Sequence, residues 1–240
     1  MTALETLTEF LSYPLNSTEE ILARFATLPN AVWRKGMDSE QQFVFVPGTR
    51  EDAATLVAHA DTVFDIADHT FAIEDGIIRS TTPNCGLGAD DRAGCAILWL
   101  LKDSGHHLLI TDGEEYGQIG ARWLVNHNPD IAEILHKSSF MVQFDRRHGS
   151  DYKFYNIPVS DEFEDFIEHS TGYTNAGKRA FTDIVTLCKS SESCCGVNLS
   201  VGYYDEHTSY ESLNIAEWTN TLKITEEMLA NPLTRFPLAN

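Results

Sequence analysis

Histidine and acidic side chains gather in a few short stretches whose residue types could bind metal ions or move protons. In the first, His59 is followed two residues later by Asp61. A neutral imidazole is a good zinc ligand, and a nearby acid can orient it from behind. Alone, a His-x-Asp pair is more often structural than catalytic.

A second stretch reads Gly-Leu-Gly-Ala-Asp-Asp-Arg-Ala-Gly over residues 86–94 and leads into an apolar run. Glycine permits close backbone approach before a helix. Asp90 or Asp91 could simply cap that helix. Two adjacent acids between glycines are more than a cap needs, and one carboxylate has two oxygens with which to bridge two metal ions.

Acids are most concentrated at Asp112, Glu114 and Glu115, directly after a strand-like run. Their mutual repulsion is costly unless a cation relieves it. A solvated acidic turn is the simpler alternative.

Two more candidates, Asp145 and His207, follow later strand-like runs. Asp145 could merely pair with the neighbouring Arg146 or Arg147, and a lone histidine is commonly structural. Together, however, the five stretches supply two imidazoles, three carboxylates and one spare glutamate, and four of the five stretches lie just after a predicted strand. Zinc accepts such nitrogen and oxygen ligands, and two ions sharing a carboxylate are a known hydrolytic arrangement.

Alternating strands and helices must position these residues. Short apolar or β-branched runs predict strands over Gln42–Val46, Thr55–Ala58, Leu108–Thr111, Phe140–Phe144 and Val197–Tyr203, with a hairpin of Phe71–Ile73 and Ile77–Arg79 around Asp75-Gly76. Helical patterns cover Ala3–Leu11, Thr18–Thr27, Ala93–Lys102, Gly117–His127, Pro129–Lys137 and Glu162–Ser170. This order predicts a three-layer α/β/α sandwich with a mixed, mainly parallel central sheet, whose sites lie at the carboxyl ends of strands.

In its motifs the chain resembles the co-catalytic di-zinc exopeptidases, which include tripeptidase T, the glutamate carboxypeptidases and the single-domain zinc aminopeptidases. The resemblance spans residues from about 55 to 215 and rests on the ordered set of motifs, above all residues 88–94, which are similar to tripeptidase T. It implies a zinc-exopeptidase-like fold.

The resemblance also implies a role for each residue. Asp90, the first acid of its pair, would bridge two divalent metal ions, zinc by default. His59 and Asp145 would complete the coordination of one ion, and Glu115 and His207 would complete that of the other. Glu114 would be the general base that takes a proton from the water activated by the two ions, and Asp61 would orient His59.

The chain departs from the tripeptidase branch in one respect. That branch inserts a lid or dimerisation domain of roughly a hundred residues between the last aspartate and the last histidine ligand. Asp145 and His207 are only 62 positions apart (207 − 145), and predicted elements already occupy part of this interval. Because a domain needs about 50 residues, we expect a single catalytic domain over residues 1–240, and the family's substrate preference does not transfer directly.

Some neighbouring residues stay open to two interpretations. Arg146, Arg147 and His148 could bind a substrate carboxylate or neutralise local acids. The pair Thr182-Asp183 resembles one near the pocket of related aminopeptidases, although a helix cap is the expected role.

Composition limits the partners. The net charge is −19 (17 basic and 36 acidic residues), which disfavours nucleic acid and anionic membranes. No long apolar run and no basic, apolar leader is present, so a cytoplasmic location is expected. The five cysteines should be buried thiols rather than disulfides.

These observations predict a metal-dependent hydrolase that cleaves the amide bond of a small peptide, as an aminopeptidase or a di- or tripeptidase. A deacylase of N-acyl amino acids, using the same site, is the first alternative. A metal-binding interaction module without catalysis is the second, and Glu114 argues against it because metal binding alone does not need the spare acid. The oligomeric state stays open.

Overall fold

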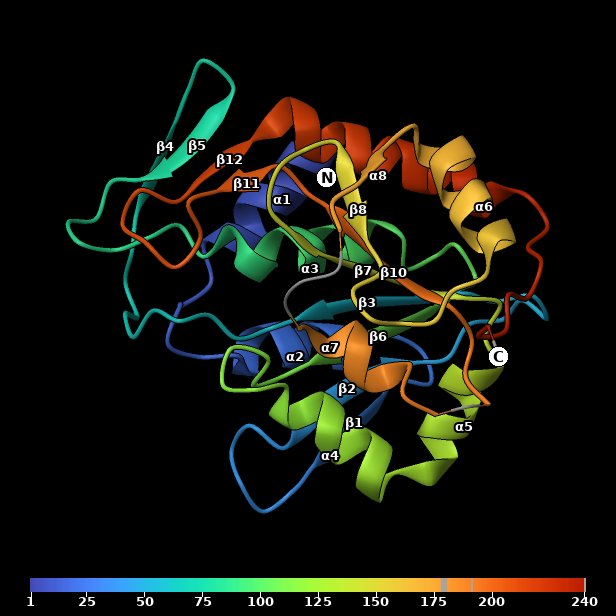
Figure 1. The fold of residues 1–240 in the computed structure, drawn as a ribbon. Helices are drawn as coiled ribbons and strands as arrows, with labels where there is room; N and C mark the ends of the chain where they lie inside the picture. Colours follow the sequence, from blue (N-terminus) through green and yellow to red (C-terminus); the bar gives the residue numbers. More distant parts are fainter. Residues whose placement is uncertain (178–180, 191, 240) are drawn as a thin grey trace.

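A central twisted sheet organises the computed structural model, which describes residues 1–177, 181–190 and 192–239 (Figure 1). Four parallel strands form its middle, and shorter strands pair at both edges, so the sheet is mixed and mainly parallel, as expected. Within the described residues its order is β1 (Val32–Lys35), β2 (Gln42–Val46), β6 (His107–Thr111), β3 (Thr55–His59), β7 (Met141–Arg146), β10 (Gly196–Ser200), β8 (Asp151–Lys153) and β9 (Thr174–Asn175).

Both faces of the sheet are covered, because successive side chains of a strand point to opposite sides. Val44, Leu56 and Val142 belong to one core cluster, and Phe43 and Val57 belong to the other. The first cluster includes α1 (Ala3–Leu11), α2 (Glu19–Ala26), α3 (Ala89–Leu100), α6 (Asp161–Thr171) and α8 (Ile215–Ala230). The second includes α4 (Ile119–His127), α5 (Pro129–Lys137) and α7 (Asp183–Leu187). The predicted three-layer α/β/α sandwich is therefore confirmed (Figure 1).

Glycines bring α3 close to the sheet. Gly88 precedes the helix with a φ of 70°, a left-handed conformation that glycine adopts without strain. A Cβ on Gly94 would collide with the Asp91 carboxylate and the carbonyl of Phe144 in β7. The first turn of α3, which carries Asp90, is therefore held directly against the strand that carries Asp145.

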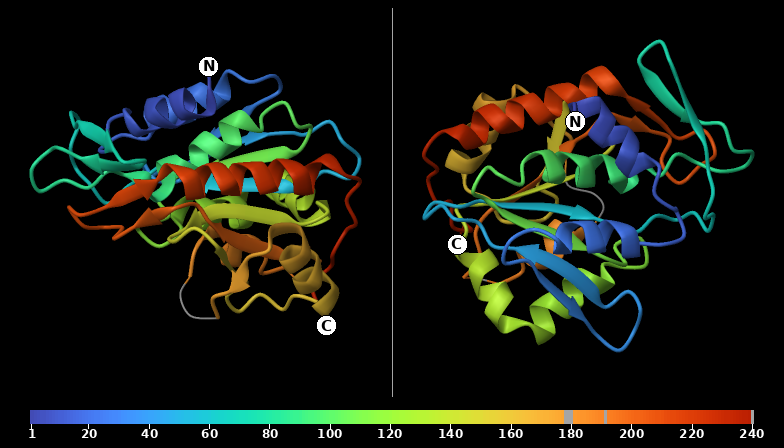
Figure 2. Two further views of the ribbon diagram at one scale, coloured as in Figure 1. Left: turned by 90° about the horizontal axis from the view of Figure 1, so that it is seen from above. Right: turned by 180° about the vertical axis from the view of Figure 1, so that it is seen from behind.

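A second, smaller sheet lies beside the main one. It has the order β11 (Tyr203–Tyr204), β12 (Ser212–Asn214), β5 (Ile77–Ser80) and β4 (Phe71–Glu74). The predicted β4–β5 hairpin is confirmed, and Asp75 and Gly76 both have positive φ in its turn. Figure 2 shows the hairpin projecting from one end of the molecule.

The prediction of one continuous strand over Val197–Tyr203 is wrong. The chain leaves β10 after Ser200 and enters the second sheet at β11. Between the two strands, Gly202 has a φ of 86° and donates a backbone hydrogen bond to the carbonyl of His148. This bend places residues 205–211 in a loop between two antiparallel strands, β11 and β12.

All five cysteines are buried and free, as expected. Among the residues that the structure describes, no helix is both long and apolar enough to cross a membrane.

Candidate metal centre

The parallel strands β3, β6 and β7 end at the same edge of the sheet, and the predicted site residues lie there. His59 is the last residue of β3 and pairs in register with Thr111, the last residue of β6. Glu114 and Glu115 follow β6 directly, and Asp145 lies near the end of β7. Alignment of strand ends therefore brings together residues that are far apart in the sequence.

Asp90 lies between the two histidines. Its Oδ1 is 3.1 Å from Nε2 of His59, and its Oδ2 is 3.2 Å from Nε2 of His207. Each carboxylate oxygen thus faces a different imidazole, which is the arrangement that a carboxylate bridging two cations requires.

Asp91 points elsewhere, although it is the neighbour of Asp90. Its Oδ2 accepts the backbone N–H of His59 at 3.1 Å, and its Oδ1 accepts the N–H of Gly94 at 3.0 Å. It therefore ties the start of α3 to the end of β3. The structure thus separates the two acids, which spacing alone could not do.

Asp145 approaches His59 and is held by several donors. Its Oδ1 lies 3.6 Å from Nε2 of His59. Its Oδ2 accepts hydrogen bonds from Thr182 at 2.6 Å and Gln143 at 2.8 Å, and Oδ1 accepts one from the hydroxyl of Tyr203 at 3.2 Å. Outer groups of this kind fix the orientation of a metal-ligating carboxylate.

Glu115 faces His207 on the other side of Asp90. Their Oε1 and Nε2 atoms are 2.9 Å apart, yet among the described residues this buried oxygen has no partner with hydrogen-bonding geometry. Two ligand atoms that converge without bonding to each other suit a cation held between them. His59, Asp90 and Glu115 each offer one atom within 4.8 Å of the others. The donor set of nitrogens and carboxylate oxygens therefore fits zinc or a similar divalent ion.

The acids of this cluster differ in their pKa: the two histidines outweigh burial and lower the pKa of Asp90, whereas the pKa values of Glu114 and Asp145 are raised. Burial and the charge of Asp145 raise the pKa of Glu114 to about 9. Burial also raises the pKa of Asp145, with Asp90 adding to the shift. Conversely, the nearby carboxylates of Asp90 and Glu115 raise the pKa of His207 to about 11. The protein has thus assembled an excess of negative charge that a bound cation would balance.

Asp61 supports both sides of the site. Nδ1 of His59 lies 3.1 Å from the backbone oxygen of Asp61 and 3.3 Å from its Oδ1. The carboxylate also accepts the N–H groups of Glu114 and Glu115, both at 3.1 Å. Burial opposes the charge of Asp61, but His59 and these N–H donors lower its pKa overall. Asp61 therefore positions the glutamate turn as well as His59.

Glu211 has a supporting role that the sequence analysis missed. It is buried, and its two oxygens accept the backbone N–H groups of Leu87 at 2.8 Å, Gly88 at 2.7 Å and Asp90 at 3.0 Å. Burial and the charge of Asp90 raise its pKa to about 8, and the three N–H donors counter that shift. Glu211 lies in the loop of His207, so it joins the two loops that carry Asp90 and His207. Its place four residues after His207 was the available signal.

The residues left open by the sequence now have definite partners. Arg146 forms a bidentate pair with Asp151, at 2.7 and 2.9 Å, and Arg147 lies 2.9 Å from Glu206. Thr182 occupies the N-cap position of α7, as expected, but its hydroxyl donates to Asp145 and makes no capping bond.

Asp183 is also more than a helix-start residue. It is fully buried and accepts a hydrogen bond from Thr111. Burial raises its pKa to about 7.

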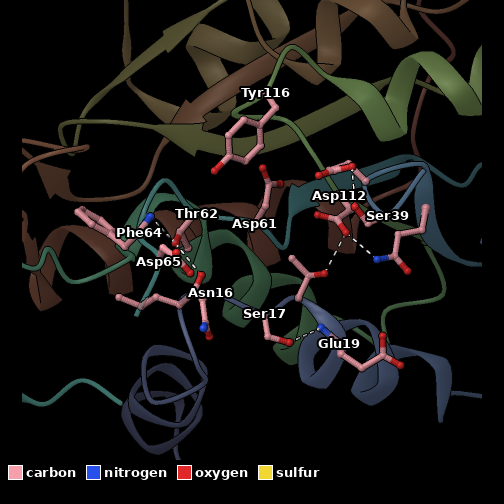
Figure 3. A pocket seen from close by; sticks show the side chains of 14 residues that line it. Asn16, Ser17, Glu19, Ser39, Asp61, Thr62, Phe64, Asp65, Asp112 and Tyr116 are labelled. Carbon is pink, nitrogen blue, oxygen red and sulfur yellow. Dashed lines mark hydrogen bonds between the residues drawn. The ribbon is translucent and has the colours of Figure 1, made fainter. Parts of the chain in front are cut away.

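Two pockets flank the Glu114–Glu115 turn. One, of about 200 Å³, is lined by Asp90, Glu114, Glu115, Asp145 and His207 together with basic and aromatic residues. The other, of about 430 Å³, adjoins Asp61 and Tyr116 and has Asn16 and Ser17 across from them (Figure 3). In this second pocket Asp112 already accepts hydrogen bonds from Thr18 and Gln42, and the candidate ligands Asp90, Glu115, Asp145 and His207 line the first pocket instead. The candidate chemistry therefore belongs to the smaller pocket.

Solved structures with this fold include several peptidases. The chain superposes on aminopeptidase PepT from Bacillus cereus with a TM-score of 0.71, at 14% identity over 95% of this chain and 97% of that one. A tripeptidase from Staphylococcus aureus gives 0.69 at 15% identity, covering 95% and 97% of the two chains. The Pyrococcus horikoshii TET1 peptidase gives 0.64 at 14% identity, covering 97% and 100%. No family model and no curated protein matches the sequence. The comparisons show the fold, an α/β architecture shared with these peptidases.

Proposed function

We propose that this protein is a metal-dependent hydrolase that cleaves the amide bond of a small peptide, acting as an exopeptidase. The placement of Asp90 carries the proposal, because its two oxygens each face one histidine. A structural acid needs no such symmetry. The peptidase fold of the superposed proteins supports the same conclusion.

The residues divide into two ligand groups around Asp90. His59 and Asp145 would hold one divalent ion, zinc by default, and Glu115 and His207 the other. When bound, such a pair supplies a water of lowered pKa and polarisation of the scissile carbonyl.

Glu114 is the proton carrier in this proposal. It lines the small pocket, and burial together with Asp145 raises its pKa to about 9. A carboxylate with a raised pKa accepts a proton from water more readily and can pass it to the leaving amine. Asp61 holds the backbone of Glu114 in place and orients His59.

We also propose that residues 1–240 act as one domain without a lid. Between Asp145 and His207, α6 packs into the same core as α3 and α8, through Phe163 and Ile167. The cytoplasmic location expected from the sequence stays a prediction.

Metal analysis combined with a substrate panel tests this function. Purified protein should bind two divalent ions per chain, and it should hydrolyse one or more of a set of dipeptides, tripeptides and N-acyl amino acids. Chelation should abolish the activity, and Zn²⁺, Co²⁺ or Mn²⁺ should restore it. Cleavage of acyl amino acids alone would favour the deacylase. Two bound ions without any turnover would instead indicate a metal-binding module.

A further inference from the structure

Lys153 is buried without an acidic partner. It is only 8% exposed, and no ion pair or side-chain hydrogen bond involves it among the described residues. Burial lowers its pKa, the charges of Arg146 and Arg147 lower it further, and the charge of Asp151 offsets part of this shift without pairing with the lysine. Because no acid among the described residues pairs with it, this lysine is available to an anion that enters the pocket.

Strand pairing places Lys153 beside the candidate metal centre. It lies in β8 directly opposite Asn198 of β10, so the two side chains share one face of the sheet. Asn198 accepts the N–H of Asp145 at 2.9 Å and donates to its carbonyl at 2.7 Å. Nζ of Lys153 lies 5.1 Å from the ring centre of Tyr155, and both residues line the pocket of Glu114.

The other two basic residues of this pocket already have anions. Arg146 is engaged by both oxygens of Asp151, and Arg147 is engaged by Glu206. Among the described lysine and arginine residues of this pocket, Lys153 is therefore the one without an ion-pair partner, and its side chain lines the pocket.

The charges of the lining residues also indicate which of the two pockets would bind an anionic group. The pocket in Figure 3 is lined by Glu19, Glu40, Asp61, Asp65 and Asp112, and no described basic residue lines it. An anionic group would be repelled there. The small pocket instead combines the candidate acidic ligands with Arg146, Arg147 and Lys153. This combination suits a molecule that presents an amide carbonyl to the metals and an anion to the lysine.

We propose that Lys153 anchors a free carboxylate of the substrate close to the scissile amide. The inference rests on the proposed function and names its substrate class: short peptides or acylated amino acids that carry a carboxylate on the residue released. The volume of about 200 Å³ admits only a small group. The carboxylate could be the C-terminal one or an acidic side chain, and the pocket chemistry is the same for both.

Three substrates separate these sources: alanyl-alanine, its C-terminal amide, and the α-amide of alanyl-glutamate, which keeps only a side-chain carboxylate. In the wild type, one of the two carboxylate forms should have a KM about 10- to 100-fold below that of alanyl-alanine amide, the range expected for a hydrogen bond to a charged group. Lys153→Met should remove this preference, and Lys153→Arg should restore part of it. Lys223→Met, at an exposed lysine paired with Glu227, is the matched control and should behave as wild type.

A binding measurement separates failure of this inference from failure of the proposed function. With Zn²⁺ present, the same compounds are titrated calorimetrically into Glu114→Gln and into Glu114→Gln/Lys153→Met. If Lys153→Met abolishes a preference for the carboxylate compounds, the anchor is supported even when the wild type hydrolyses none of them. Absence of hydrolysis by the wild type would count against the proposed peptidase activity but not against the anchor. Equal affinity for acid and amide, or a preference that survives Lys153→Met, overturns the anchor whatever the turnover.

Discussion

Glu114 and Glu115 are adjacent in sequence but face different neighbours. Oε1 of Glu115 converges with His207 on one side of Asp90. Glu114 has no such contact with either histidine and lines the pocket with a raised pKa. Two residues of the same type can therefore perform different tasks, one as a ligand and one as a base.

This difference predicts opposite effects of the same change. Glu114→Gln should retain both metal ions and lower kcat by about 10²–10⁴-fold, because the amide keeps the size but cannot accept a proton. Glu115→Gln should lower the metal content instead, since it weakens a direct ligand. Metal stoichiometry measured beside turnover tests both. Metal loss in Glu114→Gln with retention in Glu115→Gln would mean that the roles are exchanged.

Sequence motifs named candidate residues that the fold brings together, but not the residues that hold them in place. The types and order of His59, Asp90, Glu115 and His207 indicated a metal centre, because few other sites need such residues at successive strand ends. Lys153 and Asn198 carry no such signal, and the signal of Glu211 is only its closeness to His207 in the sequence. Their importance arises from strand register and loop contacts over long sequence separations, which spacing does not reveal.

At the scale of the elements, loops rather than strands complete the site. Glu211 accepts three backbone N–H groups of the loop that carries Asp90, and it uses both oxygens to do so. Because Glu211 belongs to the same loop as His207, these hydrogen bonds connect the loop of His207 to the loop of Asp90.

Glu211→Gln should therefore weaken metal binding without removing a ligand. In either orientation of the glutamine amide, its NH₂ group would face a backbone N–H. An NH₂ group cannot accept the hydrogen bond that the carboxylate oxygen accepted. We expect metal affinity to fall about 10- to 100-fold, the range typical of groups that orient ligands. Competition with a chromogenic chelator measures this, with the exposed Glu51→Gln as control. Unchanged affinity in Glu211→Gln would show that the loop holds its position without this carboxylate.

A second set of contacts, made by Arg50 and Asp52, holds the chain after α8 in place. Asp52 pairs with Arg50 and accepts the N–H of Leu233 at 2.7 Å, while Arg50 donates to the carbonyl of Leu229 at 2.9 Å. Hydrogen bonds from Arg50, followed by that of Leu233, hold the pKa of Asp52 well below its usual range.

This contact predicts a pH-dependent contribution to stability. A group whose pKa is depressed in the folded state stabilises it above its unfolded pKa of about 3.9 and loses that effect as the pH falls. Asp52→Asn should thus unfold at lower denaturant concentration than wild type at pH 7, and the difference should shrink below about pH 4. Asp68→Asn, at an exposed acid, serves as control. A difference that is constant over this range would exclude ionic pairing as its cause.

Sequence patterns located most elements but missed α8, the helix Ile215–Ala230. Its interior contains Thr219, Thr221 and Thr225, which are β-branched and weaken a helical pattern. In the structure their hydroxyls donate to carbonyls four residues earlier, and Trp218 is buried against α3. Tertiary packing therefore stabilises a helix that local propensity leaves undecided.

At the scale of the whole molecule, the sandwich class followed from alternation of strands and helices, but the second sheet did not. That sheet joins the β4–β5 hairpin to β12, a pairing between distant segments that only the folded chain reveals. The two core clusters lie on opposite faces of one sheet and share its strands.

Sharing of strands between both cores predicts cooperative unfolding. In excess chelator, calorimetry of the full chain should show one transition whose calorimetric and van't Hoff enthalpies agree. Two resolved transitions would instead mean that the chain contains independently stable units, contrary to the proposed single domain.

The central claim is that Asp90 bridges two metal ions, and anomalous X-ray diffraction at the zinc edge tests it most directly. Crystals grown or soaked with Zn²⁺ should show two strong peaks about 3.5–4 Å apart. One peak should lie beside His59 and Asp145, the other beside Glu115 and His207, with the Asp90 carboxylate between them. A single peak, or peaks remote from Asp90, would contradict the account.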